Sequence, residues 1–336
     1  MTEAELEDLL SEPTPRLVEA LGLLQGDILV LGAGGKMGPS LARLAVRASR
    51  DSGHSRRIIA AARFSNSLLP DALRGAGVQT LQCDLFDPAD VARLPDADNI
   101  VYMVGQKFGT TGESDRTWAV NAYLPGVVAT RFPRARIVAF STGNVYPLWP
   151  KHSAGPTEDD PTGPIGDYAT SALARERVFE HFSRRNGTAM VLLRLNYAVE
   201  PRYGVVRDIA DRVWRREPVD VSMGHVNLIW QRDANAVALE SLAHCESPPV
   251  VLNLTGRPVS VRSIATELGR RWGIEPRIIN TEANTALLSN PAECERRFGP
   301  PPVALDVMLD RVAEWVEQGG RSLGKPTHFE TRDGAF

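Results

Sequence analysis

The chain has 336 residues, of which 43% are hydrophobic and 24% charged, and its formal net charge is −3. This composition is typical of a globular protein with one large α/β domain and a smaller lobe, and it gives no reason to expect a nucleic-acid partner. No apolar run approaches the roughly 18–20 residues that span a bilayer, so we expect no membrane-spanning segment. Three separated cysteines (Cys83, Cys245 and Cys294), no metal-ligand spacing of histidines and an acidic N-terminus predict a cytoplasmic protein without disulfides or a metal site.

The first two hundred residues show an alternation of strands and helices. Residues 3–24 predict one or two short helices, broken near Pro13 and Pro15, in an N-terminal extension over residues 1–26. We then expect strands at 28–31, 57–63, 78–83, 99–104, 135–141 and 189–194, and helices at 39–49, 68–76, 88–94, 115–130 and 168–185. Continuous apolar strands separated by helices favour a doubly wound parallel sheet, a Rossmann-type α/β domain over residues 27–195.

After residue 195 the alternation is less regular. A helix near 205–216, strands near 219–222 and 250–254, and helices at 260–272 and 303–318 predict a smaller substrate-binding lobe over residues 196–320, with segments that complete the sheet. We expect the lobe at the carboxyl edge of the sheet, where open α/β sheets bind ligands. The polar tail, residues 321–336, is interpreted as a loose end, with an arm over a partner as the alternative.

A glycine-rich turn follows the first strand. Gly32, Gly35 and Gly38 are spaced G-x-x-G-x-x-G between an apolar strand and a helical segment. Glycines let a phosphate approach the backbone, and the helix N-terminus offers N–H groups and the positive end of its dipole. The turn therefore predicts a dinucleotide site, in which we also place Lys36 and Met37 of the turn and Val104 at the end of the strand at 99–104.

Residues after the second and third strands bear on the type of cofactor. Arg63 lies where the adenosine ribose is expected, and an arginine there favours a 2′-phosphate, so we expect NADP, with NAD as the alternative. Ser65 and Asn66 could add polar contacts to the same group. Asp84 and Leu85 follow the third strand, where the carboxylate could hold the adenine amino group or could equally cap a turn.

Several further motifs occur in an order typical of one family. They are Val120-Asn121, Ser141-Thr-x-x-Val-Tyr146, Tyr168, Arg194-Leu-Asn-Tyr197 and Asp233. With the glycine turn and Asp84-Leu85, the chain resembles the extended short-chain dehydrogenases/reductases, the NAD-dependent epimerases and dehydratases that act mainly on nucleotide sugars. The resemblance covers most of the chain. It implies a homodimer formed through the helices at 115–130 and 168–185.

The resemblance also implies roles for individual residues. Tyr168 would be the general acid/base, and Thr142 would hydrogen-bond the substrate oxygen that is oxidised or reduced. Tyr168 would also contact the cofactor. Asn121 would support the wall of the active site, and Asn196 would face the substrate.

One position departs from the family pattern. The family has a lysine four residues after the tyrosine, where its ammonium lowers the tyrosine pKa and binds the nicotinamide ribose, but here the residue is Ala172. Arg175 lies two turns beyond Tyr168, which we interpret as too far for that ribose contact. Lys107 could replace the ammonium in space, although a surface lysine is the favoured interpretation. We expect a lysine introduced at 172 to help catalysis.

A second departure concerns dehydration. Dehydratases of the family place an Asp-Glu pair after the threonine, whereas Gly143 and Asn144 stand here and cannot titrate. We therefore predict an atypical NAD(P)-dependent oxidoreductase or epimerase acting on a hydroxyl or carbonyl of a sugar-like or nucleotide-sugar substrate. The alternative is a catalytically weak or inactive dinucleotide-binding sensor or scaffold.

Overall fold

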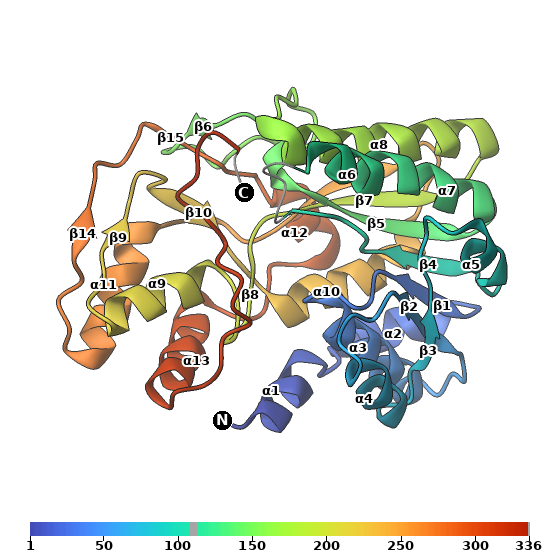
Figure 1. Ribbon diagram of the computed structural model, residues 1–336, viewed down its shortest axis with the longest axis horizontal. Helices are drawn as coiled ribbons and strands as arrows, with labels where there is room; N and C mark the ends of the chain where they lie inside the picture. The colour runs from blue at the N-terminus through green and yellow to red at the C-terminus, as the bar shows by residue number, and fades with distance from the viewer. Residues whose placement is uncertain (108–112, 335–336) are drawn as a thin grey trace.

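A seven-stranded parallel sheet forms the centre of the protein (Figure 1). The computed structural model describes residues 1–107 and 113–334. The sheet order is β12-β7-β5-β4-β1-β2-β3, and each neighbouring pair is parallel. The strands are β1 (Ile28–Leu31), β2 (Ile58–Ala62), β3 (Gln79–Gln82), β4 (Asn99–Tyr102), β5 (Arg136–Thr142), β7 (Met190–Leu195) and β12 (Val250–Leu254). The predicted doubly wound fold is confirmed, and β12 completes the sheet beside β7.

Helices cover both faces of this sheet, as its mostly apolar strands require. In β1, Ile28 and Val30 join the core on one face, whereas Leu29 and Leu31 join the core on the other. The first face is covered by α2 (Pro15–Leu23), α3 (Gly38–Asp51), α4 (Leu69–Gly75), α10 (Gln231–Glu240) and α12 (Ala292–Phe298). The second is covered by α5 (Pro88–Arg93), α7 (Leu124–Arg131) and α8 (Gly166–Asn186).

The helix predicted at 115–130 is divided by a π-helical turn. It consists of α6 (Ser114–Trp118), a π-helical segment η1 (Ala119–Tyr123) and α7. Pro125 lies in the first turn of α7 and has no N–H to donate to the carbonyl of residue 121, which favours the wider π turn just before it. Asn121 lies in this turn and is fully buried.

The smaller lobe has its own core. It is built mainly from α9 (Val205–Trp214), α11 (Val261–Trp272) and α13 (Leu305–Glu317). Three short ladders lie within the lobe: β8 (Ala198–Val199) with β11 (Ile229–Trp230), β9 (Val219–Asp220) with β14 (Ile278–Ile279), and β10 (His225–Asn227) with β13 (Pro258–Ser260). A fourth, β6 (Trp149–Pro150) with β15 (Thr285–Ala286), links the lobe to the segment after β5. Two 3-10 turns, η2 (Gly143–Val145) and η3 (Ser241–His244), follow β5 and α10.

The N-terminal extension joins the two parts of the molecule. α1 (Glu3–Leu10) begins with a capping box made by Thr2 and Glu5. Its Leu6 and Leu10 are buried in the core of the lobe, whereas Leu17 and Leu21 of α2 are buried in the core of the sheet domain. The prediction of one or two short helices is confirmed with two, and they belong to two different cores.

The C-terminal residues are not a loose end, so that prediction is wrong. Residues 321–334, which we call the C-terminal arm, run back across the lobe towards the start of α8 (Figure 1). Phe329 is fully buried, the backbone N–H of Thr327 donates to Asp208 Oδ2 at 2.7 Å, and Arg332 donates to the carbonyl of Thr285 at 2.7 Å. Mostly polar residues therefore anchor the arm through side-chain and backbone hydrogen bonds, which composition does not reveal.

Of residues 1–107 and 113–334, no helix combines the length and the apolar character needed to cross a bilayer. The three cysteines are free thiols.

Candidate active site

Two adjoining cavities open at the carboxyl edge of the sheet. The larger has a volume of about 770 Å³ and extends from the glycine turn to the ends of β2 and β3. The smaller has a volume of about 350 Å³ and lies between the glycine turn, the end of β5 and the lobe. Five residues line both cavities: Gly32, Gly35, Met103, Gly105 and Lys325. The two cavities therefore form one continuous crevice across the sheet edge.

The glycine turn is shaped by close backbone approaches. Gly32 has a φ of 83°, and a Cβ there would lie 2.9 Å from the carbonyl carbon of Met103. A Cβ at Gly38 would lie 2.5 Å from the carbonyl oxygen of Ala33. These contacts bring the N-terminus of α3 to the junction of the two cavities, where its first-turn N–H groups face a ligand. The cradle fits the diphosphate of a dinucleotide.

Most of the residues predicted at the adenosine end line the larger cavity, namely Arg63, Ser65, Asp84, Leu85 and Val104. Arg63 is exposed and forms no ion pair with any residue in the described ranges. Asp84 also accepts a hydrogen bond from the backbone N–H of Phe86 at 3.0 Å, so the carboxylate caps a turn, which is one of the two roles considered for it.

Asn66 is placed differently from its prediction. It is not among the residues that line either cavity. Its side-chain oxygen accepts a hydrogen bond from the backbone N–H of Leu68 at 3.1 Å, which stabilises the turn before α4. The side chain of Asn66 therefore stabilises a local turn and does not line the cofactor cavity.

Thr142 and Tyr168 meet at the wall of the smaller cavity. Thr142 ends β5, Tyr168 lies in the first turn of α8, and their side chains are hydrogen-bonded. Thr142 Oγ1 also lies 3.0 Å from Asn144 Oδ1. Burial raises the pKa of Tyr168 above its ordinary value, and the hydrogen bond with Thr142 and the charge of Arg175 offset only part of this effect.

Ala172 lies inside the protein rather than at the cavity. Its side chain is fully buried and packs with Val145 and Tyr146. No residue of the described chain replaces the family's lysine at that point of the helix, but a cation reaches the cavity from one turn further on.

Arg175 lines the smaller cavity, so its guanidinium reaches the site although its position on the helix lies two turns beyond Tyr168. Long side chains on a helix point back towards its N-terminus, which brings the guanidinium towards Tyr168. One terminal nitrogen donates to the carbonyl of Phe140 at 2.7 Å and the other to Asn121 Oδ1 at 2.6 Å. The side chain is 6% exposed, and its Nε has no hydrogen-bond partner among the described residues.

Asn121 supports the wall behind the cavity. Its oxygen accepts from the backbone N–H of Gln106 at 2.9 Å, and its nitrogen donates to the carbonyl of Gln106 and to Ser171 Oγ, both at 3.0 Å. With the bond from Arg175, these contacts use the whole amide inside the protein. Asn121 is not a lining residue, so its predicted wall role fits the geometry and a substrate contact does not.

Asn196 lines the smaller cavity beside Thr142, since it follows β7, which pairs with β5. Its oxygen accepts a hydrogen bond from Ser289 Oγ at 2.9 Å, which ties it to the lobe. Gly143 packs directly on this amide, and a Cβ at 143 would overlap the Asn196 side chain.

Lysines complete the smaller cavity. Lys36 and Met37 of the glycine turn line it. Lys107 lines it too, with its Nζ 5.8 Å from the centre of the Tyr168 ring, so the favoured interpretation as a surface lysine is wrong. Sequence reasoning missed Lys325, Thr327, Tyr197 and Tyr203 as lining residues. The scarcity of lysines, only four in the chain, was the available signal.

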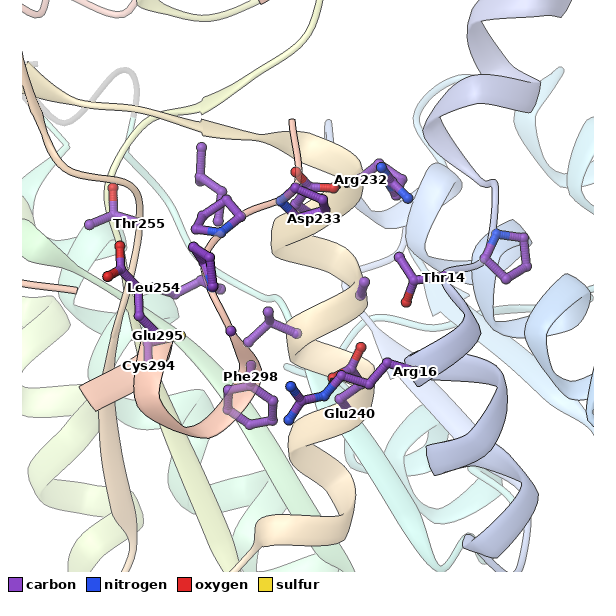
Figure 2. A pocket seen from close by; sticks show the side chains of 18 of the residues that line it. Thr14, Arg16, Arg232, Asp233, Glu240, Leu254, Thr255, Cys294, Glu295 and Phe298 are labelled. Atoms are coloured by element: carbon purple, nitrogen blue, oxygen red, sulfur yellow. Dashed lines mark ion pairs between the residues drawn. The ribbon is translucent and has the colours of Figure 1, made fainter. Parts of the chain in front are cut away.

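A separate cavity of about 570 Å³ lies between the N-terminal extension, α10 and α12 (Figure 2). Arg16 and Glu240 point toward each other there and form an ion pair at 2.9 Å. Burial raises the pKa of Glu240 to about 7, and Arg16 offsets part of this effect. None of the predicted catalytic or cofactor residues lines this cavity.

Comparisons with known proteins agree with this architecture. MoeE5 in complex with UDP-glucose and NAD is 20% identical, with a TM-score of 0.69 over 87% of this chain and 99% of its own. UDP-glucuronic acid 4-epimerase from Bacillus cereus is 16% identical, with a TM-score of 0.72 over 87% and 99%. Epimerase Mth375 from Methanothermobacter thermautotrophicus is 16% identical, with a TM-score of 0.73 over 91% and 96%. At these identities the likeness shows the fold alone.

No protein with a curated function matches the sequence. Residues 28–216, more than half of the chain, match the NAD dependent epimerase/dehydratase family. The match covers the glycine turn, Thr142, Tyr168 and Asn196. The chain therefore belongs to the NAD-dependent epimerase/dehydratase family.

Proposed function

We propose that the protein is an NAD(P)-dependent oxidoreductase or epimerase that acts on a hydroxyl or carbonyl group of a sugar-like substrate. The observation that carries this proposal is the hydrogen-bonded pair of Thr142 and Tyr168 at the wall of a cavity continuous with the glycine turn. Similar folds were solved with UDP-glucose or UDP-glucuronic acid and NAD, which supports a nucleotide sugar as one substrate class.

The proposed cofactor is NADP, with NAD as the alternative. Arg63 supports NADP because it is exposed at the adenosine end and makes no ion pair with the rest of the described chain. We expect Arg63→Ala to weaken NADPH binding about tenfold and to leave NADH binding unchanged, because only NADPH carries a 2′-phosphate. Fluorescence titration measures both affinities. Arg57→Ala is the matched control, since Arg57 pairs with Asp27 at the other end of β2. Equal loss for both cofactors would rule out a 2′-phosphate contact.

Each active-site residue then has a specific task. When bound, the cofactor supplies or accepts a hydride. Tyr168 donates its phenolic proton to the oxygen of a carbonyl, or removes the proton from an alcohol, and Thr142 holds the same oxygen by a hydrogen bond. Asn196 faces the substrate from the lobe side.

Arg175 is the cation that we propose in place of the missing lysine. Its bonds to the carbonyl of Phe140 and to Asn121 hold the guanidinium in position, and its charge favours the ionised form of Tyr168. It acts on the tyrosine through its field, so we describe it as a positioning residue.

Replacement of the tyrosine tests the proposal. Tyr168→Phe should lower hydride transfer by about 10²–10⁴-fold because the acid is removed, while cofactor affinity changes little. The measurement is NADPH oxidation in single turnovers with a panel of sugar and simple carbonyl compounds. Tyr123→Phe, at a tyrosine that is 62% exposed, is the matched control. Full turnover in Tyr168→Phe would show that the acid is assigned wrongly.

A binding protein without turnover is the second candidate. Ala172 and the raised pKa of Tyr168 favour it, since both reduce the supply of phenolate. In that case the purified protein would bind NADPH, yet no compound in the carbonyl panel would oxidise it.

We also propose a homodimer formed through α6–α7 and α8, in a cytoplasmic location. Trp118 and Tyr123 support the first part, because both are exposed aromatic side chains on this helical layer. Light scattering after size exclusion would give the mass, and a monomer at all concentrations would overturn the dimer.

A further inference from the structure

The cavity of about 570 Å³ shown in Figure 2 lies outside the crevice of the proposed activity. Its walls come from residues 12–16 of the N-terminal extension, from β11 and α10, from the end of β12, and from α12 with the loop after it. Every lining residue lies outside the range 28–216 that matches the family. Small-molecule sites usually enclose about 300–1,000 Å³. The cavity therefore has the size of a ligand site and is built by parts of this chain that the family match does not include.

Most of the wall is apolar. Side chains such as Val237, Leu254 and Phe298 line it, together with five prolines: Pro13, Pro15, Pro300, Pro301 and Pro302. A proline has a backbone carbonyl but no N–H, so these five positions offer hydrogen-bond acceptors and no backbone donors. This wall favours a ligand that has an apolar body and donates hydrogen bonds.

The carboxylate of Glu240 is the buried polar group of this wall. Its side chain is 6% exposed, and Arg16 is the only residue of the described chain that pairs with it, with Arg16 Nε 2.9 Å from Glu240 Oε2. A carboxylate has about four acceptor positions, so Glu240 has capacity left for a ligand. Burial raises the pKa of Glu240 to about 7 although Arg16 offsets part of the effect. One guanidinium therefore does not compensate for the water that this carboxylate has lost.

The two arginines of the wall are already engaged. Arg16 also donates to the carbonyl of Arg297, and its guanidinium carbon lies 5.3 Å from the centre of the Phe298 ring. Arg232 Nε lies 2.8 Å from Asp233 Oδ1. An anionic ligand would have to compete with these contacts for either guanidinium, whereas a cationic ligand would add to the partners of Glu240.

Carboxylates also outnumber guanidinium groups in the wall. Glu12 and Glu295 line the cavity in addition to Asp233 and Glu240. Glu295 pairs with Arg257, which is not a lining residue, at 3.0 Å. Glu12 forms no ion pair within residues 1–107 and 113–334. The charge of the wall together with its ion-pair partners is therefore negative, and this charge favours a cation over an anion.

We propose that this cavity binds a small organic cation, a primary amine whose ammonium group donates to Glu240 and whose compact apolar body packs against Val237, Leu254 and Phe298. An ammonium supplies three donors and a positive charge, which the acceptor-rich and negatively charged wall requires. The proposed reaction uses none of these residues, so the amine site is independent of the proposed function.

Benzylamine is the probe, with benzyl alcohol as its uncharged analogue and benzoate as its anionic analogue. Calorimetric titration of the full chain at pH 8, where the Glu240 carboxyl is mostly ionised, measures the three affinities. We expect benzylamine to bind about tenfold more tightly than benzyl alcohol, because the ammonium adds a charge-assisted hydrogen bond. Benzoate should bind more weakly than the alcohol. Equal affinities for amine and alcohol, or a preference for benzoate, would overturn the proposal.

Two substitutions locate the ammonium and the apolar body. Glu240→Gln should weaken benzylamine binding about tenfold and leave benzyl alcohol binding unchanged, because only the amine uses the charge. Glu217→Gln, at an exposed position, is the matched control and should bind like the wild type. Val237→Phe places a larger side chain in the wall and should weaken both ligands about tenfold. Unchanged benzylamine affinity in Glu240→Gln or in Val237→Phe would show that the amine binds elsewhere.

Saturating NADPH separates this cavity from the crevice. The affinity for benzylamine should be the same with and without NADPH, because no described residue lines both this cavity and the crevice. Displacement of benzylamine by NADPH would place the amine in the crevice and overturn the proposal. If benzylamine binds as expected but neither NADPH nor NADH binds, the amine site stands and the proposed function fails. If NADPH turns over but benzylamine does not bind, the amine site alone fails.

Discussion

Tyr168 keeps its proton over the ordinary pH range because burial raises the pKa of its phenol above about 10. A neutral phenol is ready to donate a proton, whereas oxidation of an alcohol needs the phenolate. The rate of carbonyl reduction should therefore be flat between pH 6 and 9, and kcat/KM for oxidation should rise about tenfold per pH unit. Steady-state rates in both directions check this. An oxidation rate that levels off below pH 8 would contradict it.

The same pH profiles of oxidation and reduction test the contribution of Arg175 to the ionisation of Tyr168. Arg175→Met removes the charge that favours the phenolate, so oxidation at pH 8 should fall while reduction keeps its flat profile. Arg175→Lys should recover part of the oxidation rate. A variant that loses both directions equally, with a lower Tm, would show that Arg175 only supports the fold.

Ala172 shows how packing changes an expectation drawn from family chemistry. A lysine at 172 would have to enter a fully buried site against Val145 and Tyr146, one turn from the Arg175 guanidinium. We now expect Ala172→Lys to lower stability by about 1–3 kcal/mol and to give no gain in turnover. Thermal unfolding and single-turnover rates measure the two effects. If Ala172→Lys is faster than the wild type and has an unchanged Tm, the expectation that a lysine at this position helps catalysis is correct.

At the scale of elements, α8 is joined to the sheet by a buried ion pair. Glu176 of α8 pairs with Arg194 of β7 at 2.8 Å, and the two side chains are 2% and 4% exposed. Glu176→Gln would leave the buried guanidinium without its carboxylate and should cost about 3–5 kcal/mol in the free energy of unfolding. Chemical denaturation gives this value. Glu180→Gln on the same helix, where the pairs are exposed, should cost below about 1 kcal/mol.

Elements with a strong local signal were predictable, and those that depend on tertiary packing were not. The apolar runs at β1, β4 and β5 and the glycine turn identify the sheet domain, because buried parallel strands need continuous apolar residues. The two-residue ladders of the lobe carry no such pattern. The helix η1–α7 was expected as one regular helix, since a π turn arises from a single proline and its surroundings.

The same distinction applies to the candidate site. Thr142, Tyr168 and the glycine turn stand in recognisable motifs, so the sequence points to them directly. Lys325 and Thr327 reach the crevice only because the C-terminal arm packs back over the lobe. Arg175 reaches it through the length and direction of its side chain. Neither effect can be derived from spacing along the chain.

On the scale of the whole molecule, stability should depend on pH through the cavity between the N-terminal extension and α10. Burial raises the pKa of Glu240 to about 7 in the folded state, against an ordinary value near 4.5. The folded state therefore binds more protons than the unfolded state between these values, and stability falls as pH rises through this window. The loss is at most about 3.5 kcal/mol, since one pKa unit corresponds to about 1.4 kcal/mol.

Removal of the charge should abolish that loss. Glu240→Gln should have the same Tm as the wild type near pH 4.5 and a higher Tm than the wild type at pH 8. The reason is that the amide does not ionise, so the variant loses no stability through this group as pH rises. Thermal unfolding at several pH values measures this difference. Glu217→Gln, at an exposed position, is the matched control. Parallel pH profiles for wild type and Glu240→Gln would contradict the assignment.

The contact between Gly143 and Asn196 restricts how this active site could acquire another chemistry. The dehydratases that the chain resembles carry an acidic pair at the positions of Gly143 and Asn144. Any side chain at 143 would collide with the Asn196 amide, which Ser289 fixes from the lobe. The two positions are therefore epistatic, and a dehydrating variant would need a coordinated change at 143 and 196 before a carboxylate could be accommodated.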